Sequence, residues 1–293
     1  MNFLEKAPAK LNLSLNLTGE TKDNYHFIVS LIAFLDLQDM LTVESSDRFS
    51  YEISGTKKDF GKDDLVLKSL KAILKKKKIE KLPAVKIILD KKIPIGAGLG
   101  GGSADAAATI RLLNRYMRLN MSLEEMTKIA FEIGSDVPSC LVSEPLILSG
   151  YGENIVKIPY FPDIEILLIY PNLNIVTNEV FAQIDMNKIQ KKKPYYYEEL
   201  LQSQCNLLVK GRLEGLNLFT NDLQSYSVTL NPRIKEAIKV LDDSGSLFSR
   251  MTGSGSACFG IFPEVKIDFA EKQIKDFYGD WFVRKCKLIG TNN

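Results

Sequence analysis

A cluster of glycines is the strongest chemical signal in the sequence. Five of the seven residues from 96 to 102 are glycine, and an alanine-rich segment typical of a helix follows them. Glycine has no Cβ to keep an anion away from the backbone N–H groups, and a helix N-terminus adds its dipole and its own unpaired N–H groups. The sequence therefore predicts a phosphate-binding loop made of Pro94, Ile95, Gly96, Ala97, Gly98, Leu99, Gly100, Gly101, Gly102, Ser103 and Ala104. A flexible surface turn is the less favoured alternative, because a linker rarely runs straight into a well-formed apolar helix.

Two familiar phosphate loops do not fit this segment. The pattern G-x-x-x-x-G-K-[ST] is absent, because no lysine follows the glycines. Gly96, Gly98 and Gly101 satisfy G-x-G-x-x-G, but a dinucleotide fold needs an acidic residue about 20 positions further on, where this chain has Met121. Neither a P-loop nor a Rossmann fold is indicated.

A second glycine loop lies between two apolar segments in the last third of the chain, at residues 252–257 (Thr-Gly-Ser-Gly-Ser-Ala). Taken alone, it fits a simple hairpin turn equally well. As a companion to the first loop, it is predicted to pack near the phosphate site.

The segments around these loops follow an α+β pattern. In the first half, strands are predicted at 10–17, 27–35, 41–44 and 84–89, and helices at 63–76, 103–117 and 122–133. The third helix opens with a capping box at Ser122 and ends at Gly134. The second half is predicted to contain strands at 165–170, 247–251, 257–262 and 281–287, helices at 197–202, 233–241 and 265–277, and an exposed loop at 190–194. Two domains are expected, an ATP-binding kinase domain at 1–158 and an α+β domain at 159–293.

The composition excludes several classes of protein. The 293 residues include 38 Lys and Arg against 36 Asp and Glu, and this balance favours neither nucleic acid nor a membrane as partner. A basic run at 75–78 follows an apolar periodic stretch and is interpreted as the solvated end of a helix rather than a nucleic-acid patch. The four cysteines lack any C-x-x-C pair, which argues against a zinc site or disulfides. No segment approaches the roughly 20 apolar residues of a membrane span, so a cytoplasmic protein is predicted.

The two glycine loops and the opening segment 8–13 together resemble the three motifs of the galactokinase, homoserine kinase, mevalonate kinase and phosphomevalonate kinase superfamily. Within it, the sequence most resembles the 4-diphosphocytidyl-2-C-methyl-D-erythritol kinase family of non-mevalonate isoprenoid biosynthesis. The narrower resemblance rests on the segments 7–13, 25–26, 34–36, 94–107, 134–138 and 252–258. It spans nearly the whole chain in the expected order and is weakest between residues 187 and 244.

The resemblance implies a two-domain small-molecule kinase fold of the α+β class. Its N-terminal domain would be ribosomal-protein-like and its C-terminal domain ferredoxin-like, with the active site in the cleft between them. The implied reaction moves the γ-phosphate of ATP to the 2-hydroxyl of 4-diphosphocytidyl-2-C-methyl-D-erythritol, with Mg²⁺ neutralising phosphate charge. The expected partner is thus a small-molecule cytidine diphosphate substrate, and the expected assembly is a monomer or a weak homodimer.

Two residues are expected to carry the catalysis. By the resemblance, Lys10 orients and polarises the attacking hydroxyl, although a lysine on an exposed strand face is the ordinary alternative. By the same resemblance, Asp136 is the catalytic base, and a carboxylate near Lys10 suits that task. An aspartate that follows a helix end often caps the next helix instead. Both roles stay open for Asp136 at this point.

Five residues are expected to bind the substrate. His26 is the only histidine, and a lone histidine is more often structural than catalytic. Beside Tyr25, however, it suits recognition of a base, since both rings can stack and the imidazole can form hydrogen bonds. The resemblance implies that the cytosine binds here, with Phe181 as a stacking partner and Thr177 nearby, and it adds Asn12 to the substrate site.

Two features depart from the family pattern, and one acidic residue lacks a clear role. Family members commonly have Asn-Leu where this chain has Asp64-Leu65, a change that could alter a contact near the nucleotide. The segment 190–197 is particular to this chain, and no function is assigned to it. Asp105 is interpreted as stabilising a helix N-terminus through the dipole, with a part in magnesium binding as the alternative.

Two other functions remain as alternatives. The first is another kinase of the superfamily, of the homoserine or mevalonate type, against which Tyr25 and His26 argue. The second is a non-catalytic metabolite- or RNA-binding protein on the same scaffold, against which the presence of both Lys10 and Asp136 argues.

Overall fold

The computed structural model describes residues 3–22, 25–58 and 60–290, and the side chains of residues 22, 25, 213, 214 and 217 lie outside that description. The chain forms two compact units, each assembled from distant segments. Unit 1 comprises residues 1–10, 37–93 and 100–143, and unit 2 comprises residues 11–36, 94–99 and 144–293. The strands β1 (Phe3–Lys22) and β2 (Tyr25–Ser45) contribute residues to both units. The expected division into domains at 1–158 and 159–293 stays a prediction.

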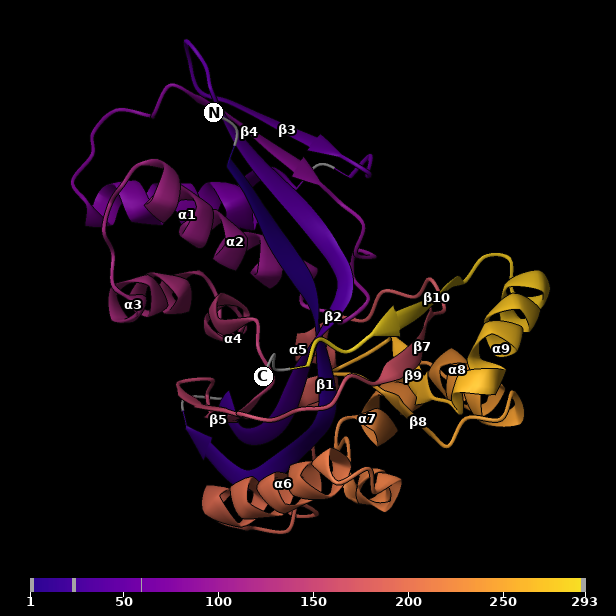
Figure 1. The fold of residues 1–293 in the computed structure, drawn as a ribbon. Helices are drawn as coiled ribbons and strands as arrows, with labels where there is room; N and C mark the ends of the chain where they lie inside the picture. The colour runs from indigo at the N-terminus through magenta and orange to yellow at the C-terminus, as the bar shows by residue number, and fades with distance from the viewer. Residues whose placement is uncertain (1–2, 23–24, 59, 291–293) are drawn as a thin grey trace. The chain divides into compact units, whose positions relative to one another are not determined.

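Unit 1 combines strands with four helices. The strand β3 (Ser50–Ser54) runs parallel to β4 (Val85–Asp90), which pairs antiparallel with residues 40–45 of β2. A short 3₁₀ helix, η1 (Gly61–Asp63), precedes α1 (Leu65–Lys76), and α2 (Gly101–Tyr116), α3 (Leu123–Ile133) and α4 (Val137–Val142) follow. These four helices gather on one side of the strands (Figure 1).

Local sequence signals explain most of these elements. Buried and half-buried residues alternate along β4, as expected for a strand with one covered face. The helix α3 begins with the predicted capping box, in which the Ser122 hydroxyl accepts from the Glu125 N–H and the Glu125 carboxylate accepts from the Ser122 N–H. Gly134 follows its last residue, as predicted. The prediction that α2 begins at Ser103 is wrong by two residues, because Gly100 takes the left-handed N-cap position and the helix begins at Gly101.

Unit 2 contains a four-stranded antiparallel sheet in the order β10-β7-β9-β8. Its strands are β7 (Glu165–Tyr170), β8 (Phe248–Met251), β9 (Cys258–Ile261) and β10 (Phe282–Lys287). The helices α8 (Arg233–Asp243) and α9 (Glu264–Phe277) pack against it. The order β7-α8-β8-β9-α9-β10 is the βαββαβ order of a ferredoxin-like unit, which confirms that part of the predicted fold.

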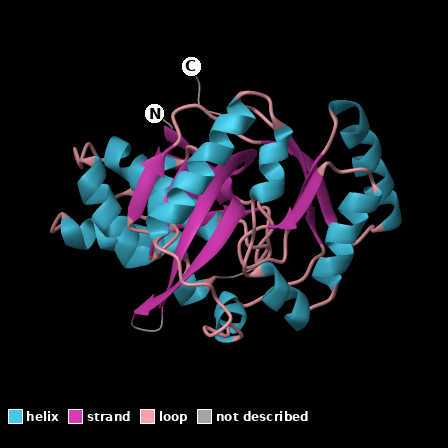
Figure 2. Cartoon of the chain, turned by 90° about the horizontal axis from the view of Figure 1, so that it is seen from below, coloured by secondary structure: helices cyan, strands magenta, loops and turns pink. Residues whose placement is uncertain are grey.

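Unit 2 also contains two further strands and the helices that lie between β7 and α8 in the chain. The strand β5 (Leu146–Gly150) pairs with residues 28–32 of β2 and with β6 (Asn154–Lys157). Between β7 and α8 lie α5 (Thr177–Ala182), α6 (Pro194–Val209), the 3₁₀ helix η2 (Leu213–Leu218) and α7 (Gln224–Leu230). Both units mix helices with strands, in agreement with the predicted α+β class (Figure 2).

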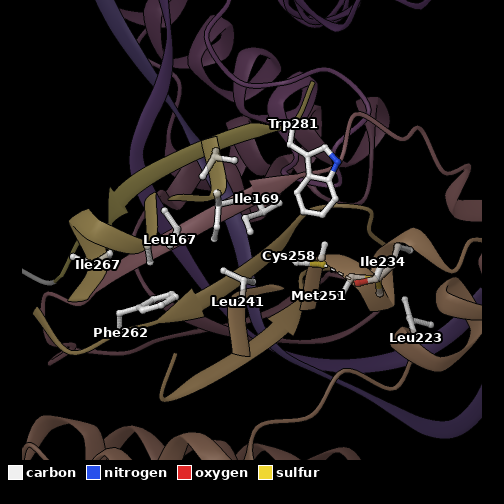
Figure 3. Close-up of a cluster of buried hydrophobic side chains, with 14 of the residues drawn as sticks. Leu167, Ile169, Leu223, Ile234, Leu241, Met251, Cys258, Phe262, Ile267 and Trp281 are labelled. Atoms are coloured by element: carbon white, nitrogen blue, oxygen red, sulfur yellow. Dashed lines mark hydrogen bonds between the residues drawn. The ribbon is translucent and has the colours of Figure 1, made fainter. Parts of the chain in front are cut away.

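The core of unit 2 lies between the four-stranded sheet and its helices. Leu167 and Ile169 of β7 lie in one cluster with Ile234 and Leu241 of α8, and all four are fully buried (Figure 3). Cys258 belongs to the same cluster, and all four cysteines of the chain are buried free thiols.

The segment 190–197 packs onto the end of β1. The Lys192 N–H donates to the Thr18 carbonyl over 3.0 Å, and the Lys192 ammonium lies 4.1 Å from the centre of the Tyr196 ring. Lys193 forms an ion pair with Glu20 over 3.1 Å. The loop predicted at 190–194 ends at Pro194, where α6 begins, because proline suits the first turn of a helix. In the described ranges, no helix is long and apolar enough to cross a membrane.

Candidate active site

Lys10 and Asp136 meet in unit 1, although 126 positions separate them in the sequence. The Lys10 ammonium donates to the Asp136 carboxylate over 3.0 Å. The Lys10 side chain is only 6% exposed, whereas that of Asp136 is 47% exposed. The pair therefore has a buried cation and a carboxylate that solvent or a ligand can reach.

The capping alternative for Asp136 does not hold in this geometry. Asp136 occupies the N-cap position of α4, but its carboxylate makes no capping hydrogen bond. Its carbonyl oxygen, not its side chain, accepts from the Ser139 hydroxyl over 2.8 Å. Among the described residues, Lys10 is the hydrogen-bond partner of this carboxylate. Cys140 follows in α4, and burial raises the pKa of its thiol to about 12, so it is no nucleophile here.

Gly100 lies against the Lys10 side chain. A Cβ on Gly100 would stand 3.2 Å from both Cβ and Cε of Lys10, tighter than most real contacts, and the residue has a φ of +63°. The first hydrogen bond of α2 runs from the Ala104 N–H to the Gly100 carbonyl. The N–H groups of Gly101, Gly102 and Ser103 therefore come before the first backbone hydrogen bond of α2 and have no carbonyl acceptor within the helix. An N-terminus built this way, bare of side chains before Ser103, fits a phosphate group.

The other half of the first loop, residues 94–99, packs against the second glycine loop within unit 2. The Ala257 N–H donates to the Ala97 carbonyl over 2.9 Å. A Cβ on Gly98 would stand 2.4 Å from the Gly255 carbonyl oxygen, so only glycine fits there. The second loop therefore packs against the first, as predicted, while phosphate binding by the first loop stays a prediction.

Asn12 is tied to the second loop and to β2. Its backbone N–H donates to the Thr252 hydroxyl over 2.8 Å, and its side-chain amide donates to the Ser30 hydroxyl over 2.7 Å. The side-chain oxygen is buried and has no hydrogen-bond partner among the described residues. A buried polar atom without a partner is costly, so this oxygen is a candidate for contact with a ligand.

His26 and Phe181 lie together in unit 2, as the predicted base site requires. Their ring centres are 5.4 Å apart with a 30° tilt. Burial lowers the pKa of His26, and its buried Nδ1 has no partner among the described residues. The Thr177 hydroxyl hydrogen-bonds the Ser254 hydroxyl over 2.9 Å, which links α5 to the second loop. The side chain of Tyr25 lies outside the described residues, so its predicted role stays a prediction.

Asp105 belongs to a buried charge cluster that the sequence did not reveal. Lys91 forms ion pairs with Asp39 and, over 2.7 Å, with Asp105, and none of the three side chains is more than 5% exposed. Burial and the charge of Asp39 raise the pKa of Asp105 against the opposing effect of Lys91, because one cation balances only one of two carboxylates. The helix-dipole interpretation of Asp105 is wrong, since it is the fifth residue of α2 and pairs with Lys91.

Asp64 has both carboxylate oxygens engaged inside unit 1. One accepts from the Leu67 N–H over 3.0 Å and caps α1, and the other accepts from the Tyr51 hydroxyl over 2.9 Å. Asp64 is therefore the N-cap of α1.

Known proteins provide an independent comparison. The family model for the GHMP kinases N terminal domain matches residues 64–144, and that for GHMP kinases C terminal matches residues 206–280. A 4-diphosphocytidyl-2-C-methyl-D-erythritol kinase from Chelativorans sp. (strain BNC1) is 34% identical over 281 residues, which cover 95% of this chain and 93% of the relative. A kinase of the same name from Agrobacterium fabrum is 35% identical over 294 residues, which cover 98% of this chain and 96% of the relative.

The solved structures agree with these relatives. A crystal structure of 4-(cytidine 5'-diphospho)-2C-methyl-D-erythritol kinase matches with a TM-score of 0.80 and 27% identity, and the match covers 99% of this chain and 100% of that one. The relatives and this structure thus match the chain over almost its whole length, in sequence and in fold. The chain belongs to the 4-diphosphocytidyl-2-C-methyl-D-erythritol kinase family of the GHMP kinases.

Proposed function

We propose that this protein transfers the γ-phosphate of ATP to the 2-hydroxyl of 4-diphosphocytidyl-2-C-methyl-D-erythritol, a step of non-mevalonate isoprenoid precursor synthesis. The observation that carries the proposal is the 3.0 Å pair of Lys10 and Asp136, with Gly100 against Lys10. The pair supplies a carboxylate and a cation next to the start of α2. Family membership supports the use of ATP.

In the proposed mechanism, Asp136 accepts the proton of the attacking hydroxyl. Phosphoryl transfer depends mainly on positioning and charge stabilisation, with a carboxylate to orient and deprotonate the nucleophile. Lys10 holds the Asp136 carboxylate in place and stabilises the negative charge that gathers between hydroxyl and phosphate. The exposed fraction of Asp136, 47%, leaves room for the hydroxyl to approach.

The phosphates of ATP are assigned to the loop 94–104, whose α2 end offers N–H groups without helical acceptors. Mg²⁺ would neutralise the β- and γ-phosphate charge when bound. In the described residues, no group of three or more His, Cys, Asp or Glu side chains could hold a metal ion. The ion is therefore proposed to be held mainly by phosphate oxygens, with the Ser103 hydroxyl as a protein ligand. Asp105 is not a suitable ligand, because Lys91 already binds its buried carboxylate.

The cytosine of the substrate is assigned to the pair of His26 and Phe181, with Tyr25 and Thr177 beside it. Burial lowers the pKa of His26 and so favours the neutral imidazole, which offers one donor and one acceptor nitrogen. Asn12 is assigned to the substrate on the strength of its unpartnered side-chain oxygen. Its position two residues after Lys10 on β1 suits contact with the part of the substrate that reacts.

A coupled assay for ADP release tests the proposed function. Wild-type protein should turn over with 4-diphosphocytidyl-2-C-methyl-D-erythritol and remain at background with homoserine or mevalonate. Turnover with homoserine or mevalonate, and not with the cytidine substrate, would show that the protein is a kinase of another type in the superfamily. Background rates with all three would refute the proposal.

Replacement of His26 by alanine is expected to raise KM for the cytidine substrate while KM for ATP stays within about twofold. A hydrogen bond lost from a fitted site typically costs about 1–3 kcal/mol, or roughly 5- to 150-fold in KM. His26→Phe keeps a ring next to Phe181 but removes both nitrogens, so it separates stacking from hydrogen bonding. Steady-state kinetics with each substrate varied in turn provide the measurement. A rise in KM for ATP alone would instead place His26 at the nucleotide.

A further inference from the structure

The side-chain amide of Asn12 is held in a chain of hydrogen bonds in unit 2. The Asn12 amide nitrogen lies 2.7 Å from the Ser30 hydroxyl oxygen. The Ser30 hydroxyl lies in turn 2.6 Å from the backbone carbonyl oxygen of Ser14. Asn12 and Ser30 are 3% and 0% exposed, so water cannot substitute for these partners.

The carbonyl at the end of this chain fixes the direction of every hydrogen bond in it. A backbone carbonyl can only accept, so the single hydroxyl proton of Ser30 must point at Ser14. The Ser30 oxygen is then left as an acceptor for Asn12, and it accepts only from the NH₂ end of the amide. The amide therefore cannot flip without placing two acceptors in contact, and the Asn12 carbonyl oxygen must face the other way.

The oxygen that faces away has no hydrogen-bond partner among the described residues, and a glycine lies beside it. No described residue donates to the Asn12 side-chain oxygen, although it is buried. Its neighbour is Gly253 of the second loop, where a Cβ would stand 3.3 Å from this oxygen. Gly253 therefore places no side chain against this oxygen. The Thr252 hydroxyl, which accepts from the Asn12 backbone N–H over 2.8 Å, holds the backbone at this point.

We infer that Ser30 is a positioning residue. It orients the Asn12 amide so that the side-chain oxygen of Asn12 can accept a hydrogen bond from the substrate that receives the phosphate. The group bound there must be a donor, and it cannot be a phosphate or carbonyl oxygen. In the substrate under the proposed function, on which this inference rests, the polyol hydroxyls are donors of this kind. Asn12 thus selects for a hydroxyl, and Ser30 sets that selectivity without touching the substrate.

The test compares variants of Ser30 in the full chain. Ser30→Ala removes the acceptor for the amide NH₂, so the amide can rotate and present its nitrogen. We expect kcat/KM for the cytidine substrate to fall about 10-fold or more, with KM for ATP unchanged. Ser30→Thr keeps the hydroxyl and should stay within about threefold of wild type. Ser30→Cys keeps the volume with a much weaker acceptor, and should lose activity as Ser30→Ala does even where the alanine variant folds poorly.

A matched control and a double variant separate positioning from general destabilisation. Ser149 is another buried serine of unit 2, and its hydroxyl donates to Glu198 over 2.5 Å. Ser149→Ala should therefore leave both KM values near wild type. Because Ser30 acts through Asn12, adding Ser30→Ala to Asn12→Ala should cost less than about twofold beyond Asn12→Ala alone. Full additivity of the two losses, or equal kinetics of Ser30→Ala and Ser149→Ala, would overturn the inference.

Failure of the inference and failure of the proposed function give different results. Wild-type protein that does not phosphorylate the cytidine substrate refutes the proposed function before any variant is made. The same Ser30 series is then run with the alcohol that the wild type does accept, where a selective loss for that alcohol supports the orientation of Asn12. Normal turnover of the cytidine substrate by Ser30→Ala leaves the proposed function intact and rejects the role of Ser30.

Discussion

Replacing Asp136 with asparagine is expected to lower kcat by roughly 10²–10⁴-fold, the usual contribution of a positioned general base. Asparagine keeps the size of the side chain but cannot accept the proton of the attacking hydroxyl. KM for both substrates should change little, because the variant keeps the loop and the base site. Stopped assays with purified protein measure kcat, and the melting temperature shows whether the variant is folded.

The stability of the Asp136 variant should fall only modestly, for structural reasons. The Asp136 carboxylate makes no capping hydrogen bond to α4, so asparagine removes no cap. The Asp136 side chain is half exposed, which limits what the pair contributes, but Lys10 is only 6% exposed and loses its counter-charge, so the cost should exceed the roughly 0–1 kcal/mol of a fully exposed pair. Asp63→Asn breaks the exposed pair with Lys68 and is the matched control, with normal kcat expected. Near-normal turnover in folded Asp136→Asn protein would contradict its assignment as the base.

Lys10 and Asp136 should behave as one catalytic unit. The double variant Lys10→Ala, Asp136→Asn is expected to lose less activity than the product of the two single losses, since each residue needs the other. If the loss in the double variant equals the product of the two single losses, Lys10 acts neither on the Asp136 carboxylate nor on the charge next to it.

The parts of this site that the sequence predicted are those with a local signal or a strong resemblance. The glycine run and the alanine-rich helix lie next to each other in the chain, so a loop that leads into a helix was predictable from the local sequence. Even there, the start of α2 was predicted two residues late, because Gly101 and Gly102 have low helix propensity yet occupy its first turn. The pairing of Lys10 with Asp136 came from the resemblance, since no spacing relates residues 126 positions apart.

The unpredicted parts depend on contacts that no local pattern encodes. Ser30 lies in an apolar strand, where a serine carries no signal of its own. Its importance arises only because the folded chain places it between the Asn12 amide and a carbonyl. Lys91 follows a strand and precedes the loop, like many surface lysines, but the fold buries it between two carboxylates. Burial of a charge is a property of the tertiary structure, and the sequence around Lys91 is equally compatible with exposure.

The buried cluster around Lys91 predicts the largest effect on stability. Lys91→Met is expected to lower the free energy of unfolding by about 3–5 kcal/mol at pH 7, because it leaves two buried carboxylates without their cation. Lys86→Met, on the strand β4 that Lys91 follows, is the matched control. Lys86 pairs with Glu52 over 2.8 Å, but their side chains are 32% and 59% exposed, so a loss of only about 0–1 kcal/mol is expected. Urea denaturation of wild type and both variants measures the difference.

The effect of pH on the Lys91 variant separates buried charge from lost packing. The pKa of Asp105 is already raised in the wild-type fold, and removing Lys91 raises it further. Since the folded-state pKa lies above the unfolded value of about 3.9, the folded protein binds the proton first as the pH falls, and protonation stabilises the fold. The stability lost in Lys91→Met should therefore shrink as the pH is lowered from 7. Adding Asp105→Asn should recover part of the loss at pH 7 by removing one buried charge. A loss that is independent of pH and unrelieved by Asp105→Asn would show that Lys91 stabilises unit 1 through packing of its aliphatic stem, and not through charge.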